Sequence, residues 1–506
     1  MAAASDQTRL KPSLSAAAQA ADALTLVLLS VWVWWSLIAR PVSLFNGLRD
    51  FLSPMVVLYV AVCVQVVRHL MWPRPSAMAR LADLQAAILE RPHLATALRA
   101  FLMTRPAVFV VAFAAVITIG ISSSPGFILS REPLDNLPAR FDAGWYGGIA
   151  LDGYYWDHTF QRQRNIAFFP ALPLLMRPVG AVLGMYEEGP SRERRMLRAL
   201  WGGVAISLVA FFWALLYTSR LATDLIGPER APAAALLLAA YPFAAYFNAP
   251  YTESLFLLAS TGACYHFLRR EWVAASAWGI LVGLTRPNGC FLAIPLALLA
   301  LQRQKGKGIG ESASGPSEAR SRRARALGGR APSATKNADR PFDVFVRLVV
   351  AGMPGVGMLL FTLYLYRITG VWFAWAHIQE AWGRSYEGLP IVTFFSNVGD
   401  LSWLQFIQNN PYNSINALGV LFALVMIYPV FRKVGLAWGV LVLINLLPPL
   451  ITGGFLSMGR MTSTLFPLFF AFAAVIPPRA VTGWAAAFAI GQGLCAALFF
   501  TWRALF

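Results

Sequence analysis

Runs of about twenty apolar residues recur along the chain, and they restrict its fold more than any other feature. A run of that length crosses the hydrocarbon core of a bilayer as a helix. The runs are continuous rather than alternating with polar residues, so they predict helices and not the strands of a membrane barrel. The hydrophobic share of 58% also exceeds that of ordinary soluble domains. The sequence therefore predicts an all-α polytopic membrane protein.

The four cysteines predict neither a disulfide framework nor a metal site. Cys63, Cys264, Cys290 and Cys495 lie inside or at the ends of apolar runs, where a thiol packs as a small apolar group. The first twenty residues are polar and alanine-rich, and the apolar run after them is long enough to stay in the membrane. No cleaved signal peptide is therefore expected.

About a third of the formal net charge of +18 lies in one segment, residues 303–345. Gly, Ser, Ala and Arg dominate this segment, which predicts a disordered basic linker on the cytoplasmic side. Anionic membrane lipids are the partners expected for it. No aromatic residues are interleaved with the basic ones, and no folded nucleic-acid reader accompanies them, so a nucleic-acid partner is not expected.

Counting outward from this linker gives about thirteen membrane helices and a division into four parts. The first part, residues 1–104, holds a cytoplasmic tail and two helices with a basic cytoplasmic loop. A core follows at 105–302 with an external loop at 124–198, and the region after the linker, 346–506, carries a second external loop at 367–412. The helices are expected at residues 22–38, 52–72, 105–123, 199–218, 232–248, 253–268, 273–286, 288–302, 346–366, 413–431, 434–452, 462–477 and 481–500.

Residues 168–184 contain several prolines and fit a helix lying at the membrane surface better than a crossing. With this segment outside, an arginine cluster also lies outside, against the usual preference of positive charge for the cytoplasm. The cluster consists of Arg192, Arg194, Arg195 and Arg198. Guanidinium groups bind phosphate through paired hydrogen bonds, so these residues are candidate phosphate ligands. An ordinary solvated turn is the alternative.

Polar residues at membrane depth converge on the same outer face in this topology. Ionisable groups near hydrocarbon are expensive and commonly mark a site, so these residues are candidate substrate ligands. The set comprises Asp152, Tyr146, Tyr251, Glu253, Arg286, Asn288, His377, Gln379, Trp382, Arg384 and Arg460. Three of these residues have an alternative to a role in substrate binding. Glu253 would interact with a helix dipole, Arg286 would extend to the membrane interface, and His377 would form a structural hydrogen bond.

The stretch RFDAGWYGGIALDGYY, residues 140–155, places Asp142 directly after an aromatic residue where the chain leaves the membrane. A carboxylate in a partly desolvated cleft becomes more basic, and aromatic faces beside it pack on a sugar or a lipid. The alternative is a solvated loop carboxylate that pairs with Arg140.

This stretch, followed by NIAFFPALPLL, NAPYTESLFLL, GLTRPNG and WAHIQEAWGR, resembles the bacterial branch of the phosphatidylinositol-glycan class V mannosyltransferase family. The fragments occur in the family's order between residues 140 and 470. Two positions depart from its pattern, because Phe141 replaces a tryptophan and Met461 replaces an aromatic residue. The resemblance implies the GT-C glycosyltransferase fold, with a long first periplasmic loop that contains juxtamembrane helices.

The resemblance also implies an enzyme that moves a sugar, mannose in the family, from a polyprenyl-phosphate carrier to a lipid or glycan acceptor. Asp142 matches the family's first-loop acid and is therefore the expected general base. One base suffices for an inverting displacement, because a lipid phosphate leaves without being protonated. Arg286, Arg460 or the arginine cluster would hold the leaving phosphate. No cofactor is required, and Asp142 with Glu253 is the pair available to a divalent metal.

The expected location is the bacterial inner membrane, with the active site on the periplasmic side. A secondary transporter or lipid flippase is the main alternative, since it would use the same polar cavity to bind a translocated solute. No inverted repeat is evident in the sequence, which favours the enzyme. A non-catalytic assembly subunit is the third possibility.

Overall fold

The computed structural model describes residues 16–38, 54–72, 85–302, 341–384, 405, 411–503 and 505. The described chain is helical and contains no strands, which confirms the predicted all-α class. Most of the predicted basic linker lies outside the described residues, and its last part forms the start of helix α13 (Pro341–Ala351). The chain forms two compact units, Met1–Ala95 and Thr96–Phe506.

The first unit is built on two helices, α1 (Ala16–Ile38) and α2 (Pro54–Met71), which pack side by side. A polar contact joins them within their apolar surfaces. Gln65 donates hydrogen bonds to Asp22 and Thr25, and the Arg68 Nε atom lies 3.2 Å from Asp22 Oδ1. Polar side chains in a membrane helix need such partners, because lipid offers none.

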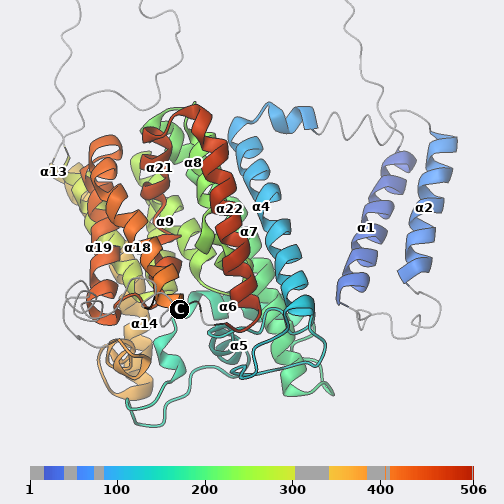
Figure 1. Ribbon diagram of the computed structural model, residues 1–506, viewed down its shortest axis with the longest axis horizontal. Helices are drawn as coiled ribbons and strands as arrows, with labels where there is room; N and C mark the ends of the chain where they lie inside the picture. Colours follow the sequence, from blue (N-terminus) through green and yellow to red (C-terminus); the bar gives the residue numbers. More distant parts are fainter. Residues whose placement is uncertain are drawn as a thin grey trace, which may run out of the picture. The chain divides into compact units, whose positions relative to one another are not determined.

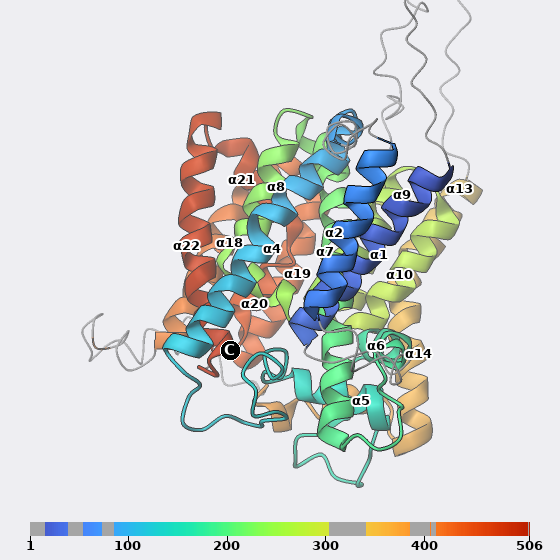
Figure 2. The same ribbon diagram turned by 90° about the vertical axis from the view of Figure 1, so that its right-hand side faces the viewer.

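The second unit is a helical bundle that carries short helices at one end. The elements used below are α4 (Pro92–Thr118), α5 (Ala143–Asp152), α6 (Ala171–Val182), α7 (Arg192–Ile226), α8 (Ala231–Ala240), η3 (Pro242–Asn248), α9 (Glu253–Leu268), α10 (Trp272–Thr285), η4 (Pro287–Leu292), α11 (Ala293–Leu301), α14 (Met353–Thr369), α15 (Ala374–His377), α18 (Pro411–Pro429), α19 (Leu436–Gly453), α20 (Met458–Thr462), α21 (Phe466–Val475) and α22 (Val481–Phe500). Helices α5 and α6 lie at the end of the bundle where the chain's C terminus also lies (Figures 1 and 2).

Four helices among the described residues are long and apolar enough to cross a membrane, and two bent helix pairs raise the number to six. The prediction of about thirteen spans is therefore not confirmed. Many of the remaining apolar helices have only ten to seventeen residues, which is shorter than a full crossing. The chain is polytopic, as predicted, but a larger share of its apolar sequence than expected forms short helices.

One of these breaks bends the chain by 77° between α8 and η3. Pro242 begins η3 and has no backbone N–H to continue the ladder of the preceding helix. The buried guanidinium of Arg105 donates to the carbonyls of Ala239 and Ala244, at 2.7 and 2.6 Å, and so satisfies backbone groups around the bend. Irregular backbone at this depth requires such internal partners. The bend brings Asn248 and the start of α9 into the interior.

A second break separates α10 from η4. Arg286 has extended backbone, with φ −156° and ψ 155°, because a residue before proline avoids the helical region. At this end α10 packs closely on α14. A Cβ atom on Gly283 would lie 2.0 Å from the carbonyl oxygen of Pro354, and one on Gly357 would lie 2.1 Å from that of Ile280. These two glycines thus allow α10 and α14 to approach closely just before Arg286.

Candidate active site

A cavity of about 1010 Å³ opens in the second unit, between the short helices and the bundle. It is large enough for a sugar together with part of a lipid-linked phosphate. Its wall comes from segments far apart in sequence. Among the lining residues are Asp142, Trp145, Tyr146, Gln163, Phe168, Thr285, Arg286, Asn288, Cys290, Gln379, Trp382, Arg384, Pro448, Pro449, Arg460, Met461 and Trp502.

Asp142 lies at the start of α5 and lines this cavity. Its backbone N–H donates to the hydroxyl of Tyr251 at 3.0 Å, and that hydroxyl donates to the carbonyl of Arg140 at 3.1 Å. The Asp142 side chain remains 27% exposed. Arg140 does not pair with it, because the Arg140 guanidinium is buried against carbonyls such as that of Phe500. The predicted alternative of a solvated Asp142–Arg140 pair is therefore wrong.

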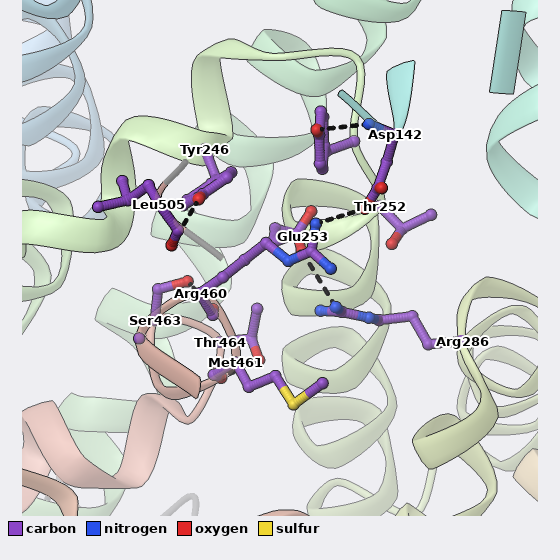
Figure 3. A network of polar contacts seen from close by, with 12 residues as sticks. Asp142, Tyr246, Thr252, Glu253, Arg286, Arg460, Met461, Ser463, Thr464 and Leu505 are labelled. Carbon is purple, nitrogen blue, oxygen red and sulfur yellow. Dashed lines mark hydrogen bonds and ion pairs between the residues drawn. The ribbon is translucent and has the colours of Figure 1, made fainter. Parts of the chain in front are cut away.

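Two carboxylates and two arginines form a connected network beside the cavity (Figure 3). Arg460 Nη1 donates to Asp142 Oδ2 at 2.7 Å, while Arg460 Nε lies 3.2 Å from Glu253 Oε1. Arg286 Nη2 lies 3.0 Å from the same Glu253 oxygen. The four residues come from α5, α9, α20 and the break before η4, so the bends of the chain assemble them. Asp142 and Glu253 are the pair expected to be available to a divalent metal. In the structure both carboxylates contact the guanidinium of Arg460.

Arg384 adds a third positive charge to this wall of the cavity. Burial and, to a smaller extent, the nearby cations Arg460 and Arg286 lower the pKa of Arg384 to about 10, against the opposing effect of Asp142. A guanidinium with that pKa is still charged at neutral pH. With three arginines against two carboxylates, the cluster carries one excess positive charge, which suits a phosphate-bearing ligand.

Aromatic side chains form another part of the cavity wall. Trp145 is parallel to Phe168 with ring centroids 5.9 Å apart, and Trp382 meets both rings edge-on at 5.2 and 5.1 Å. Tyr146 packs edge-on against Phe168, and its hydroxyl lies 3.5 Å from Thr252 Oγ1. Trp145 follows Asp142 by three residues, so one face of the same helix turn presents both. Asp142 therefore has aromatic rings on one side and the arginine network that begins at Arg460 on another.

Further predicted residues surround this centre. Asn288 lines the cavity and donates to Asn445 Oδ1 at 2.8 Å, and Gln379 lines it and donates to the Trp375 carbonyl at 3.2 Å. His377 does not line the cavity, and its ring contacts Phe160 at 5.7 Å between centroids.

Asp152 and the predicted arginine cluster do not line the cavity. Asp152 forms an exposed ion pair with Arg192. Arg198 bonds to Glu187 at 2.7 Å and to the carbonyl of Gly184. Arg194 and Arg195 lie in the same first turns of α7. The structure thus separates these four arginines from the Asp142 network. They do not line the cavity that contains Asp142, so a phosphate bound beside Asp142 would not contact them there.

Sequence reasoning missed several cavity residues. Trp145 could have been found, because a helix beginning at Asp142 places position 145 on the same face. Trp502 carried no such signal, since it reaches the cavity only through the packing of the chain end, where its ring lies 4.5 Å from that of Phe141. Among the residues that the structure describes, no three His, Cys, Asp or Glu side chains gather as metal ligands.

Comparisons with known proteins agree with the motifs. Residues 93–303 match the family model described as mannosyltransferase (PIG-V), in agreement with the resemblance of the motifs. No curated protein matches the sequence.

Two solved structures from Archaeoglobus fulgidus are similar to this chain. One is the oligosaccharyltransferase complex with Zn and sulfate, at 14% identity and a TM-score of 0.36. The other is the oligosaccharyltransferase AglB with an inhibitory peptide and a dolichol-phosphate, at 13% identity and a TM-score of 0.34. Each alignment covers 79% of this chain, and the chain spans about half of theirs, 53% and 56%.

Proposed function

We propose that this chain transfers a sugar from a polyprenyl-phosphate carrier to a hydroxyl group of a lipid or glycan acceptor. Its residues 93–303 match the mannosyltransferase (PIG-V) family. The family match supports the glycosyltransferase class. The observation that carries the finer proposal is the position of Asp142, which lines a large cavity with aromatic rings around it and three arginines nearby.

In the proposed reaction, Asp142 accepts the proton of the acceptor hydroxyl as its oxygen attacks the anomeric carbon of the donor. The bond from that carbon to the phosphate oxygen breaks, and the electron pair leaves with the phosphate. A single displacement inverts the anomeric carbon. The phosphate is a sufficiently good leaving group to depart unprotonated, so one carboxylate completes the proton balance.

The arginines hold the charge that develops on the departing phosphate. Arg286, Arg384 and Arg460 line the cavity, and guanidinium groups bind phosphate through directed, charge-assisted hydrogen bonds. Arg460 contacts Asp142 at 2.7 Å, which places phosphate binding next to the base. Tyr146, Trp382, Gln379 and Asn288 line the same space and are proposed to contact the sugars.

Trp145, Phe168 and the apolar residues at Pro448 and Pro449 give the cavity surfaces for sugar faces and for a lipid chain. We place this cavity at the periplasmic face of a bacterial inner membrane, because the charge pattern puts the basic segments on the other side. His377, Asp152 and the arginines at 192, 194, 195 and 198 remain proposed ligands of parts of the substrates that extend beyond the cavity.

Transfer of radiolabelled mannose from polyprenyl-phosphate-mannose to membrane lipids by the purified protein tests this function. We expect Asp142→Asn to reduce the rate by at least about 100-fold, since general base catalysis commonly supplies that factor. Asp157→Asn is the matched control, because Asp157 lies in the same loop, pairs with Arg164 and does not line the cavity.

Transfer that is unchanged in Asp142→Asn would remove Asp142 from its role as base. Movement of the intact carrier lipid across a vesicle membrane, without label transfer in the wild type, would instead support the transporter alternative. Both assays use the full chain.

A further inference from the structure

Glu253 lies behind the cavity wall rather than in it. It begins α9, its side chain is only 1% exposed, and it is absent from the residues that line the cavity. Among the described residues, neither carboxylate oxygen accepts a hydrogen bond of good geometry. A buried ionised carboxylate without such bonds is costly, so its presence requires a compensating charge.

The compensation comes from two arginines that converge on one oxygen of Glu253. Arg286 Nη2 lies 3.0 Å and Arg460 Nε lies 3.2 Å from Oε1. Both arginines line the cavity, whereas the carboxylate does not. The contact to Arg460 uses Nε and leaves Nη1 to reach Asp142 at 2.7 Å. Glu253 therefore lies between two guanidiniums that border the cavity, and one of them also bonds to Asp142.

Without a negative charge between them, two guanidiniums at this spacing would repel each other in a low-dielectric interior. They would separate or turn, and the distance between the phosphate-binding groups and Asp142 would change. An arginine that loses its anchor also regains rotamer freedom, which has to be removed again each time substrate binds. Displacing a catalytic group by about 1 Å costs roughly 100-fold in rate.

We infer that Glu253 is a positioning residue that fixes Arg286 and Arg460 for the leaving phosphate and does not itself touch substrate. This inference rests on the proposed function. It replaces direct substrate contact, the role expected for Glu253 from the sequence, with an indirect one. Arg286 lines the cavity, so the arginine held in this way borders the space that an anion would occupy.

The two roles predict opposite effects on donor binding. If Glu253 touched the donor, Glu253→Gln would weaken donor binding. If it positions the arginines, the variant removes one negative charge from beside an anion site, so binding of the phosphate stays equal or tightens while the chemical step slows.

The test measures kcat and the KM for polyprenyl-phosphate-mannose, together with direct binding of undecaprenyl phosphate, in purified full-length variants. We expect Glu253→Gln to lower kcat by about 100-fold, with undecaprenyl phosphate bound at least as tightly as by the wild type. Glu253→Asp keeps the charge and should recover part of kcat. Glu271→Gln is the matched control, because Glu271 lies beyond the other end of α9 and is half exposed.

Chemical rescue gives a second test of the inference, and Glu253→Asp keeps the inference testable where Glu253→Gln is poorly folded. Free guanidinium should restore part of the activity of Arg460→Ala, and the rescue should be lost when Glu253→Gln is added, because the anchor for the added cation is gone. Full kcat in Glu253→Gln, or weakened undecaprenyl phosphate binding, would overturn the positioning role. The wild-type protein in the same assay separates this outcome from failure of the proposed function, since absence of label transfer by the wild type contradicts the function itself.

Discussion

Arg384 differs from the other two arginines of the site, because no carboxylate pairs with it among the described residues. Its pKa is lowered to about 10 by burial and by the neighbouring cations Arg460 and Arg286. At every pH below that value the folded protein holds a charged group in an unfavourable place. The folded-state pKa is below the unfolded one, so this penalty disappears only as the pH rises through about 10 and beyond.

Arg384→Gln should therefore stabilise the fold and weaken the function at pH 7. We expect a higher Tm, since the desolvated charge is gone, and roughly tenfold weaker binding of undecaprenyl phosphate, since one charge-assisted hydrogen bond is lost. Thermal unfolding and lipid binding measured on the same preparation check both effects. The control is Arg162→Gln, an exposed arginine away from the cavity wall. A lower Tm with unchanged binding would show that Arg384 has a structural role instead.

At the scale of elements, the breaks between helices assemble the site, and a proline stands at each of the two breaks described. The chain bends at Pro242, and α10 ends where Pro287 follows Arg286. Both proline signals are visible in the sequence. The close approach of α10 to α14 is not, because it depends on which glycines meet once the helices pack.

Gly283→Ala should destabilise the protein, because its Cβ atom would lie 2.0 Å from the Pro354 carbonyl oxygen and backbone has to move. We expect a loss of about 1–3 kcal/mol, the usual range for overpacking, seen as a lower Tm in detergent. Transfer activity should fall as well, since Arg286 follows three residues later. Gly355→Ala on α14 is the control, because a Cβ atom there meets nothing within 4 Å. Equal Tm values for the two variants would contradict this account of the contact.

The sequence predicted which residues form the site better than it predicted which of them pair with one another. Asp142, Arg286 and Arg460 were expected at one face, and the structure joins them. The buried position of Glu253 was not predicted, because it depends on packing between α9, α20 and the break before η4. The arginine cluster at 192–198 was expected to bind phosphate, yet Asp152 and Glu187 already pair with two of its members. Pairing between surface charges leaves no trace in a single sequence.

The helical class followed from apolar runs, since their length and continuity are local properties. The number of crossings did not follow, because a run such as residues 232–248 reads as one span and folds as two helices at 77°. Whether an apolar run crosses or bends depends on partners such as Arg105, which come from elsewhere in the chain.

For the whole molecule, the side of the membrane on which the cavity opens is testable through Cys290, which lines it. Cys264 and Cys495 are buried, so a Cys63→Ser variant leaves Cys290 as the accessible thiol. We expect a membrane-impermeant maleimide to label this variant in spheroplasts, and undecaprenyl phosphate to slow the labelling. Labelling confined to inside-out vesicles would place the cavity on the cytoplasmic side.

Trp502 and Leu505 lie close to the Asp142 network. Trp502 lines the cavity, and the carbonyl of Leu505 accepts hydrogen bonds from Asn416 and Tyr246. Enzymes that handle activated sugars must keep water away from the anomeric carbon. Under the proposed function, removing the Trp502 side chain would open this wall of the cavity to solvent, and the carrier-linked sugar would then be released by hydrolysis as free monosaccharide instead of being joined to an alcohol.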